Sequence, residues 1–163
     1  MVASFAGPVR LYRNLGGCRF ADETAASGLQ SHPRNEGVVL ADLDADGDLD
    51  LYVTSYAGEN RLYRNTLDSP SYLKVRLPGG SAGIGTVVTV RTAGAVDGAD
   101  TSASQELVSA FGYCSQGPEE LLFRVPPGSL SLVTIAAPGS VPRTLGPRAA
   151  GLLDLSGTRP PAP

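Results

Sequence analysis

The feature that most constrains this chain is a run of acidic residues in the stretch VVLADLDADGDLDLYV, from Val38 to Val53. An aspartate stands at every second position, at Asp42, Asp44, Asp46, Asp48 and Asp50. In an extended chain, charges two residues apart lie about 7 Å from each other and repel by roughly 2 kcal/mol per pair at an effective dielectric constant near 20. The net charge of the whole chain is only -3, so this local concentration of charge needs a compensating partner.

A glycine inside the run indicates that the segment is a loop and not a straight strand. Gly47 can adopt a positive φ at no steric cost, so the chain can turn there and direct several oxygens toward one point. The pattern D-x-D-x-D-G-x-x-D then offers carboxylates from its first, third, fifth and ninth positions and a backbone carbonyl from its seventh. We therefore expect a metal site formed by the side chains of Asp42, Asp44, Asp46 and Asp50 and by the carbonyl of Asp48.

The donor set predicts calcium as the cofactor. Ca²⁺ takes about six to eight oxygen ligands, whereas Mg²⁺ usually keeps several waters and uses fewer carboxylates, so magnesium is the alternative cation. Zinc and copper favour Cys or His ligands. The one histidine, His32, stands ten residues before Asp42, which disfavours both metals.

Three other interpretations of the loop compete with this one. It could be a solvated acidic turn without an ion. An EF-hand would need a glutamate at the twelfth position, where this chain has Val53, and a helix on each side. The stretch VVLADLD is also similar to phosphatases of the haloacid dehalogenase type, which would use Asp42 and Asp44. That family commonly has Thr or Val at the position of Asp46, and its flanks form a parallel sheet with helices.

Composition and charge exclude several function classes. The chain is 42% hydrophobic, which is typical of a globular protein, and its 20 glycines and 13 prolines favour short strands and many turns. The fold class expected is all-β. The 13 basic residues are fewer than the 16 acidic ones and are spread singly, so nucleic acid is not an expected partner. No apolar run approaches the roughly 20 residues of a membrane-spanning helix, and the N-terminal segment shows no secretory signal.

A pentapeptide that occurs twice indicates a repeat. RLYRN stands at residues 10–14 and again at residues 61–65, an offset of 51 residues. Periods of about 40 to 50 residues are typical of β-propeller blades. Within the period, strands are expected at RLYRN, CRFADETAASGL, VVLADL and LDLYVTSY, separated by glycine-rich or polar turns.

The second half of the chain predicts a different arrangement. YLKVRL, GTVVTVRT, ELVSAFGY, ELLFRV and LSLVTIAA are interpreted as strands of an antiparallel β module, and AGAVDGADTSAS as one of the segments that separate them. The domains expected are a blade over residues 1–70, the β module over 71–138, and a Pro/Gly/Ala-rich tail, partly disordered, over 139–163.

These residues together resemble the FG-GAP/VCBS repeat proteins, whose propeller blades carry a calcium loop between two strands. LYRNLGGCRFADETAASGL and GVVLADLDADGDLDLYVTSYAGENRLYRN are similar to one such unit, and the segment from YLKVRL to ELLFRV resembles the ASPIC/UnbV module of the cartilage acidic protein family. The resemblance covers residues 10–138 and implies a partial propeller of about one blade followed by an antiparallel β module.

The resemblance also implies a function. It points to a secreted, extracellular or matrix-type protein that binds calcium structurally, contacts other extracellular or matrix proteins, and has no enzymatic activity. One blade is shorter than a propeller of about four to eight blades, so the chain is interpreted as a fragment or short isoform, and a non-functional truncated fragment is an alternative.

The other chemistry-bearing residues carry weaker hypotheses. His32 alone does not make a nucleophilic triad. Glu119 and Glu120 could be a general acid and base, but neighbours in a strand point to opposite faces, so a solvated turn is expected instead. Cys18 and Cys114 could form one bridge or remain two thiols. The tyrosines of the repeated motif are expected to pack in the blade, with Asn14 or Asn65 bonded to its own turn.

Overall fold

The computed structural model describes residues 2–4, 7–29, 34–56, 58–66, 71–96, 98–110 and 116–157. These ranges hold strands, turns and one short 3-10 helix, Gly80–Ala82, and no α-helix, which confirms the all-β fold class. No helix in them is long and apolar enough to span a membrane. The strands are β1 Val2–Ser4, β2 Gly7–Arg10, β3 Tyr12–Gly16, β4 Arg19–Asp22, β5 Asn35–Ala41, β6 Asp50–Ser55, β7 Arg61–Tyr63, β8 Tyr72–Arg76, β9 Val87–Val96, β10 Ala99–Glu106, β11 Glu120–Arg124, β12 Ser131–Ala136, β13 Arg143–Arg148 and β14 Gly151–Asp154.

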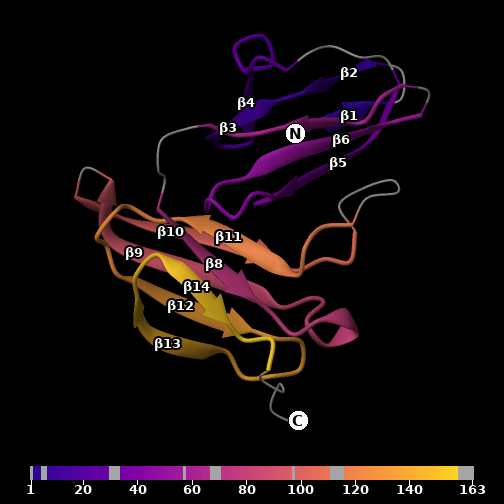
Figure 1. The fold of residues 1–163 in the computed structure, drawn as a ribbon. Helices are drawn as coiled ribbons and strands as arrows, with labels where there is room; N and C mark the ends of the chain where they lie inside the picture. The colour runs from indigo at the N-terminus through magenta and orange to yellow at the C-terminus, as the bar shows by residue number, and fades with distance from the viewer. Residues whose placement is uncertain are drawn as a thin grey trace. The chain divides into compact units, whose positions relative to one another are not determined.

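The chain divides into two compact units (Figure 1). The described residues of Met1–Asp44, Leu49–Thr66 and Ala110–Gln116 make up the first unit. Those of Ala45–Asp48, Leu67–Ser109 and Gly117–Pro163 make up the second.

The described residues of the first unit form three small sheets. β1 pairs with β2 and β3 pairs with β4, both antiparallel. β5, β6 and β7 form a third antiparallel sheet in which β6 is central. Its buried cluster consists of Val9, Leu51 and Val53, with Leu29, Val38 and Tyr63 packed against it. Val9 comes from β2 and the other two from β6, so β2 packs against the three-stranded sheet, and Tyr63 packs as expected.

The second unit is a sandwich of two sheets, one of order β10-β9-β12-β13 and one of order β11-β8-β14. β8 and β11 alternate buried residues with half-buried or exposed ones, and in β8 Leu73 and Val75 are the buried residues. The core cluster draws Val88 and Val133 from the first sheet and Phe123 from the second. The two sheets therefore pack face to face over one apolar core.

Two strand expectations for this unit are corrected. Residues 107–110 of ELVSAFGY, expected to belong to a strand, lie in none. Residues of AGAVDGADTSAS, expected to separate two strands, form the end of β9 and most of β10. The segment 139–163, expected to be a partly disordered tail, contains β13 and β14. The strand pairings within residues 71–138 are antiparallel, as expected, whereas β14, which lies beyond that range, pairs parallel to β8. Long ladders with β9, β12 and β8 supply the order that the composition of these segments does not predict.

Candidate metal site

The acidic loop closes a hairpin. β5 ends at Ala41 and β6 begins at Asp50, and these two residues are cross-strand partners. The apolar, β-branched residues on both sides, such as Val38 and Val53, explain why the flanks pair as strands. The residues between them are held in a loop whose two ends are fixed by the ladder.

The loop turns at two residues with positive φ. Gly47 has a φ of 100°, as the sequence predicts, and a side chain at this position would be strained. Ala45 has a φ of 62°, which is uncommon for a residue with a Cβ. No pattern in the sequence indicates Ala45, since alanine gives no signal for this conformation.

Three of the five predicted residues gather. One carboxylate oxygen from each of Asp42, Asp44 and Asp46 lies within 4.8 Å of the others. Oxygens bound to one calcium ion at about 2.4 Å are at most about 4.8 Å apart. Asp42 is half-buried, while Asp44 and Asp46 are exposed. The donor set is entirely hard oxygen and the spacing fits one cation, so these residues fit a calcium ion.

The gathered carboxylates repel one another, by roughly 3 kcal/mol per pair at that separation and an effective dielectric constant near 20. Arg64 forms an ion pair with Asp44 through its Nε. The arginine follows β7 and belongs to the second copy of the RLYRN motif. It partly compensates the charge of the loop.

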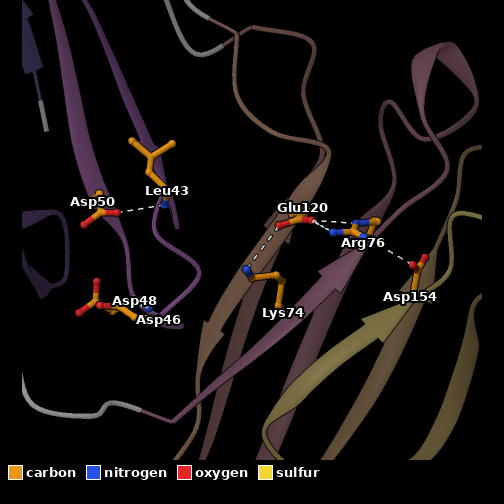
Figure 2. A network of polar contacts seen from close by, with 8 residues as sticks. All are labelled: Leu43, Asp46, Asp48, Asp50, Lys74, Arg76, Glu120 and Asp154. Atoms are coloured by element: carbon orange, nitrogen blue, oxygen red, sulfur yellow. Dashed lines mark hydrogen bonds and ion pairs between the residues drawn. The ribbon is translucent and has the colours of Figure 1, made fainter. Parts of the chain in front are cut away.

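Asp50 fixes the loop to its surroundings (Figure 2). Its side chain is only 2% exposed. Its Oδ2 accepts a hydrogen bond from the amide of Leu43 at 3.0 Å, and its Oδ1 accepts one from the amide of Asn65 at 2.9 Å. An ionised carboxylate has about four acceptor positions, so these two bonds leave further lone pairs on the same oxygens.

Asp48 lies at the tip of the loop. Its amide donates to Oδ1 of Asp46 at 3.1 Å, and its residue surface is 3% exposed. One carboxylate oxygen, Oδ1, of Asp48 and of Asp42 is shielded from solvent. The role of the Asp48 carbonyl as a ligand stays a prediction, as do the individual ligand roles of the other aspartates.

Sequence reasoning recognised the repeated motif but missed its contribution to the loop. The second copy supplies the guanidinium of Arg64 to Asp44 and the amide of Asn65 to Asp50. In the first copy, Arg13 instead pairs with Glu23 at 2.5 Å, and Asn14 Oδ1 accepts the amide of Gly16 at 2.8 Å. The latter bond confirms the expected turn at Asn14. The signal available in the sequence was the position of the second motif, which follows the strand that leaves the acidic loop.

The remaining candidates lie elsewhere or have other partners. Glu120 is not part of a solvated turn, and Figure 2 shows it beside Arg76. Nε and Nη2 of Arg76 donate to Glu120 Oε1 at 2.8 and 2.5 Å. Nζ of Lys74 lies 3.8 Å from Glu120 Oε2. The bond to Glu120, chiefly, raises the pKa of the Arg76 guanidinium. Glu119 accepts the amide of Gly80 at 2.7 Å.

Two expectations concern residues that the structure does not describe. His32 and Cys114 both lie outside the described ranges. Cys18 is exposed and carries a free thiol. The arrangement that a haloacid dehalogenase would need is not present around Asp42 and Asp44, because β5 and β6 are antiparallel neighbours.

Comparisons with known proteins agree with the resemblance given by the motifs. Residues 1–53 match the family described as FG-GAP-like repeat. Cartilage acidic protein 1 of Mus musculus is 36% identical over 107 residues, which are 64% of this chain and 16% of that protein. Cartilage acidic protein 1 of Homo sapiens is 37% identical over 71 residues, 43% of this chain and 10% of that protein.

The matched segments therefore span less than a fifth of the length of these relatives. The family match covers both β5 and the acidic loop. These comparisons support the identification made from the motifs: residues 1–53 match the FG-GAP-like repeat family, and part of the chain is similar to cartilage acidic protein 1.

Proposed function

We propose that this chain is a calcium-binding interaction protein of the extracellular, matrix type, in which the ion is structural and no catalysis takes place. The observation that supports this most directly is the grouping of the Asp42, Asp44 and Asp46 carboxylates at a spacing that one ion can bridge. The similarity to proteins named for cartilage supports the extracellular setting and extracellular partners.

In this proposal the loop residues have distinct roles. Asp42, Asp44 and Asp46 bind through side-chain oxygens, and Asp48 contributes its carbonyl. Asp50 adds a carboxylate oxygen while it holds the amides of Leu43 and Asn65. Calcium supplies positive charge that offsets the repulsion within the loop.

The consequence of binding is stability. An ion that binds only the folded form stabilises it by RT ln(1 + [L]/Kd), about 2.7 kcal/mol at a hundredfold excess over Kd. The buried apolar cluster of the first unit is small and contributes little stability, so we propose that bound calcium supplies part of the stability of this unit. The organisation proposed is an FG-GAP-type blade over residues 1–70 and an ASPIC/UnbV-type β module over 71–138, extended by β13 and β14.

Isothermal titration of CaCl₂ into the purified chain tests the proposal. One saturable site is expected, and Asp46→Ala should weaken its affinity at least about tenfold because it removes a charged ligand. Glu119→Ala serves as the control, since Glu119 binds the amide of Gly80 away from the loop. Equal losses in both variants, or no saturable heat in the unaltered chain, would contradict the site.

A parallel titration with MgCl₂ separates the two cations. The gathered carboxylates favour an ion that accepts many oxygen ligands in a flexible geometry, so calcium should displace magnesium from the loop. Tighter binding of magnesium would show that the loop serves a different ion.

A further inference from the structure

The loop contains a peptide bond whose chemistry the metal site does not explain. Asp46 is followed by Gly47, and both lie at the turning point of the loop. An aspartate followed by glycine can close a five-membered ring, because the next amide nitrogen can reach the side-chain carboxyl carbon when no Cβ obstructs it. We propose that the bond between Asp46 and Gly47 is a site of isoaspartate formation, and that a cation in the loop suppresses it.

The reaction needs only water and a proton. The nitrogen of Gly47 bonds to Cγ of Asp46, and one carboxyl oxygen leaves as water with the amide proton and one proton from solvent. Water then opens the resulting cyclic imide at either carbonyl. Opening at the former side-chain carbonyl restores aspartate, whereas opening at the other gives isoaspartate, in which the backbone runs through the side chain and gains one methylene.

The local geometry brings the reacting groups together. Oδ1 of Asp46 accepts the amide of Asp48 at 3.1 Å, so the carboxyl group folds back over the intervening Gly47. Asp46 is exposed, which gives water access for both steps. A Cβ built on Gly47 would have no neighbour within 4 Å.

Two other aspartates provide an internal comparison. Asp22 accepts the amide of Thr24 at 3.0 Å, and Asp154 accepts that of Ser156 at 2.9 Å, so both fold back in the same way as Asp46. Both are also exposed. They are followed by Glu23 and Leu155, whose side chains obstruct the approach of the nitrogen. The three sites therefore differ chiefly in the residue after the aspartate.

The effect of a cation rests on the proposed function. A carboxylate bound to calcium directs its oxygens at the ion, and the carboxyl oxygen that must leave as water is then held. Conversely, isoaspartate at position 46 would displace one ligand and lengthen the loop by one methylene. An aged molecule should accordingly lose its site.

Peptide mapping of the full chain tests the inference. The chain is incubated at neutral pH and physiological temperature, in EDTA or in CaCl₂, and digested with trypsin. Asp46, Asp22 and Asp154 then lie in separate peptides, namely 35–61, 20–34 and the peptide beginning at residue 149. Isoaspartate is located by electron-transfer fragmentation, because it leaves the mass unchanged.

In EDTA, isoaspartate is expected at residue 46 at least about ten times faster than at residues 22 and 154. Asp46→Glu keeps the charge but would require a larger ring, so it should abolish the product in peptide 35–61. Glu23→Gly should create a new product at Asp22. Absence of isoaspartate at residue 46, or its persistence in Asp46→Glu, overturns the proposal.

The incubation in CaCl₂ distinguishes the proposed metal site from the proposed isoaspartate site. Calcium should slow the reaction at residue 46 at least about fivefold, while a second aspartate-glycine pair, Asp97 and Gly98 in peptide 92–124, should be unaffected. Isoaspartate that forms equally with and without calcium supports the modification site and contradicts its protection by the cation. Calcium binding by titration without isoaspartate in EDTA supports the metal site and contradicts this inference.

Discussion

The two units differ in what holds them together. Among the residues that the structure describes, the buried core cluster of the second unit contains eleven apolar residues, whereas that of the first contains three. The first unit instead carries both ends of the acidic loop, with the buried Asp50 bonded to two amides and Arg64 paired with Asp44. Apolar burial needs no bound ion and depends only weakly on ionic strength, whereas charged contacts respond to both. The stability of the first unit should thus depend on solution conditions far more than that of the second.

The largest effect is expected from a cavity in the second unit. Phe123 is 1% exposed in the core, so Phe123→Ala should cost about 3 to 5 kcal/mol. Hydrogen exchange read by mass spectrometry should show lost protection in β8 and β11. Peptides from β5 and β6 should keep theirs, and equal losses in both units would show that the two unfold together.

A somewhat smaller loss is expected from Asp50→Asn in the first unit. An amide has one oxygen, so one of the two backbone donors now held by Asp50 would face an NH₂ group. Hydrogen bonds to charged groups contribute about 1.5 to 3 kcal/mol each, and a loss of about 2 to 3 kcal/mol follows. The loss is measured by denaturant titration, with unfolding of the first unit followed by hydrogen exchange in residues 35–61. A loss confined to the second unit would contradict the role of Asp50.

Arg64→Ala sharpens the comparison because its two effects have opposite signs. The ion pair is solvent-exposed, so without calcium its removal should cost less than about 1 kcal/mol. In the variant, Asp44 no longer shares its charge with a guanidinium, so the affinity of the loop for calcium should rise about two- to threefold. Calorimetry compares the variant with Arg13→Ala, which alters the equivalent arginine of the first motif. A fall in affinity would mean that Arg64 positions Asp44 for the ion.

The smallest effect concerns acid titration, in which the two units should behave alike. The hydroxyl and then the amide of Thr24 lower the pKa of Asp22, and those of Ser156 lower the pKa of Asp154. Such a carboxylate stabilises the folded chain above its unfolded pKa of 3.8, and the contribution is lost as the pH falls through the lowered value.

Thr24→Ala and Ser156→Ala should each move the pKa of the neighbouring aspartate back toward its ordinary value. NMR titration of the two carboxyl carbons measures both shifts. A pKa shift at one aspartate and none at the other would show that the two hydrogen bonds, although similar, do not stabilise their carboxylates equally.

Local signals explain what the sequence predicted correctly. Alternating and β-branched residues marked β5, β6, β8, β11 and β12, because these strands bury one face. The glycine at position 47 marked the turn, since few other residues adopt its backbone conformation readily. The gathering of Asp42, Asp44 and Asp46 followed from the spacing around that turn.

Contacts between distant segments explain what the sequence did not predict. β10 is almost entirely exposed and has small polar residues, so it forms only because β9 offers a ladder. β14 is also mostly exposed, and it pairs with β8, a strand far from it in the sequence. Asn65 reaches Asp50 through the pairing of β6 with β7, and its backbone amide has no sequence signature at all.

The parallel pairing of β14 with β8 has a kinetic consequence. Arg76 and Asp154, paired at 3.3 Å across these strands, are 78 residues apart in the chain. Long-range pairing of this kind forms late, because the loop it closes must be ordered first. During synthesis, β8 would leave the ribosome long before its partner exists, and its free edge would be open to wrong pairing in the meantime. The three-stranded sheet of the second unit is therefore completed only after β14 has been made.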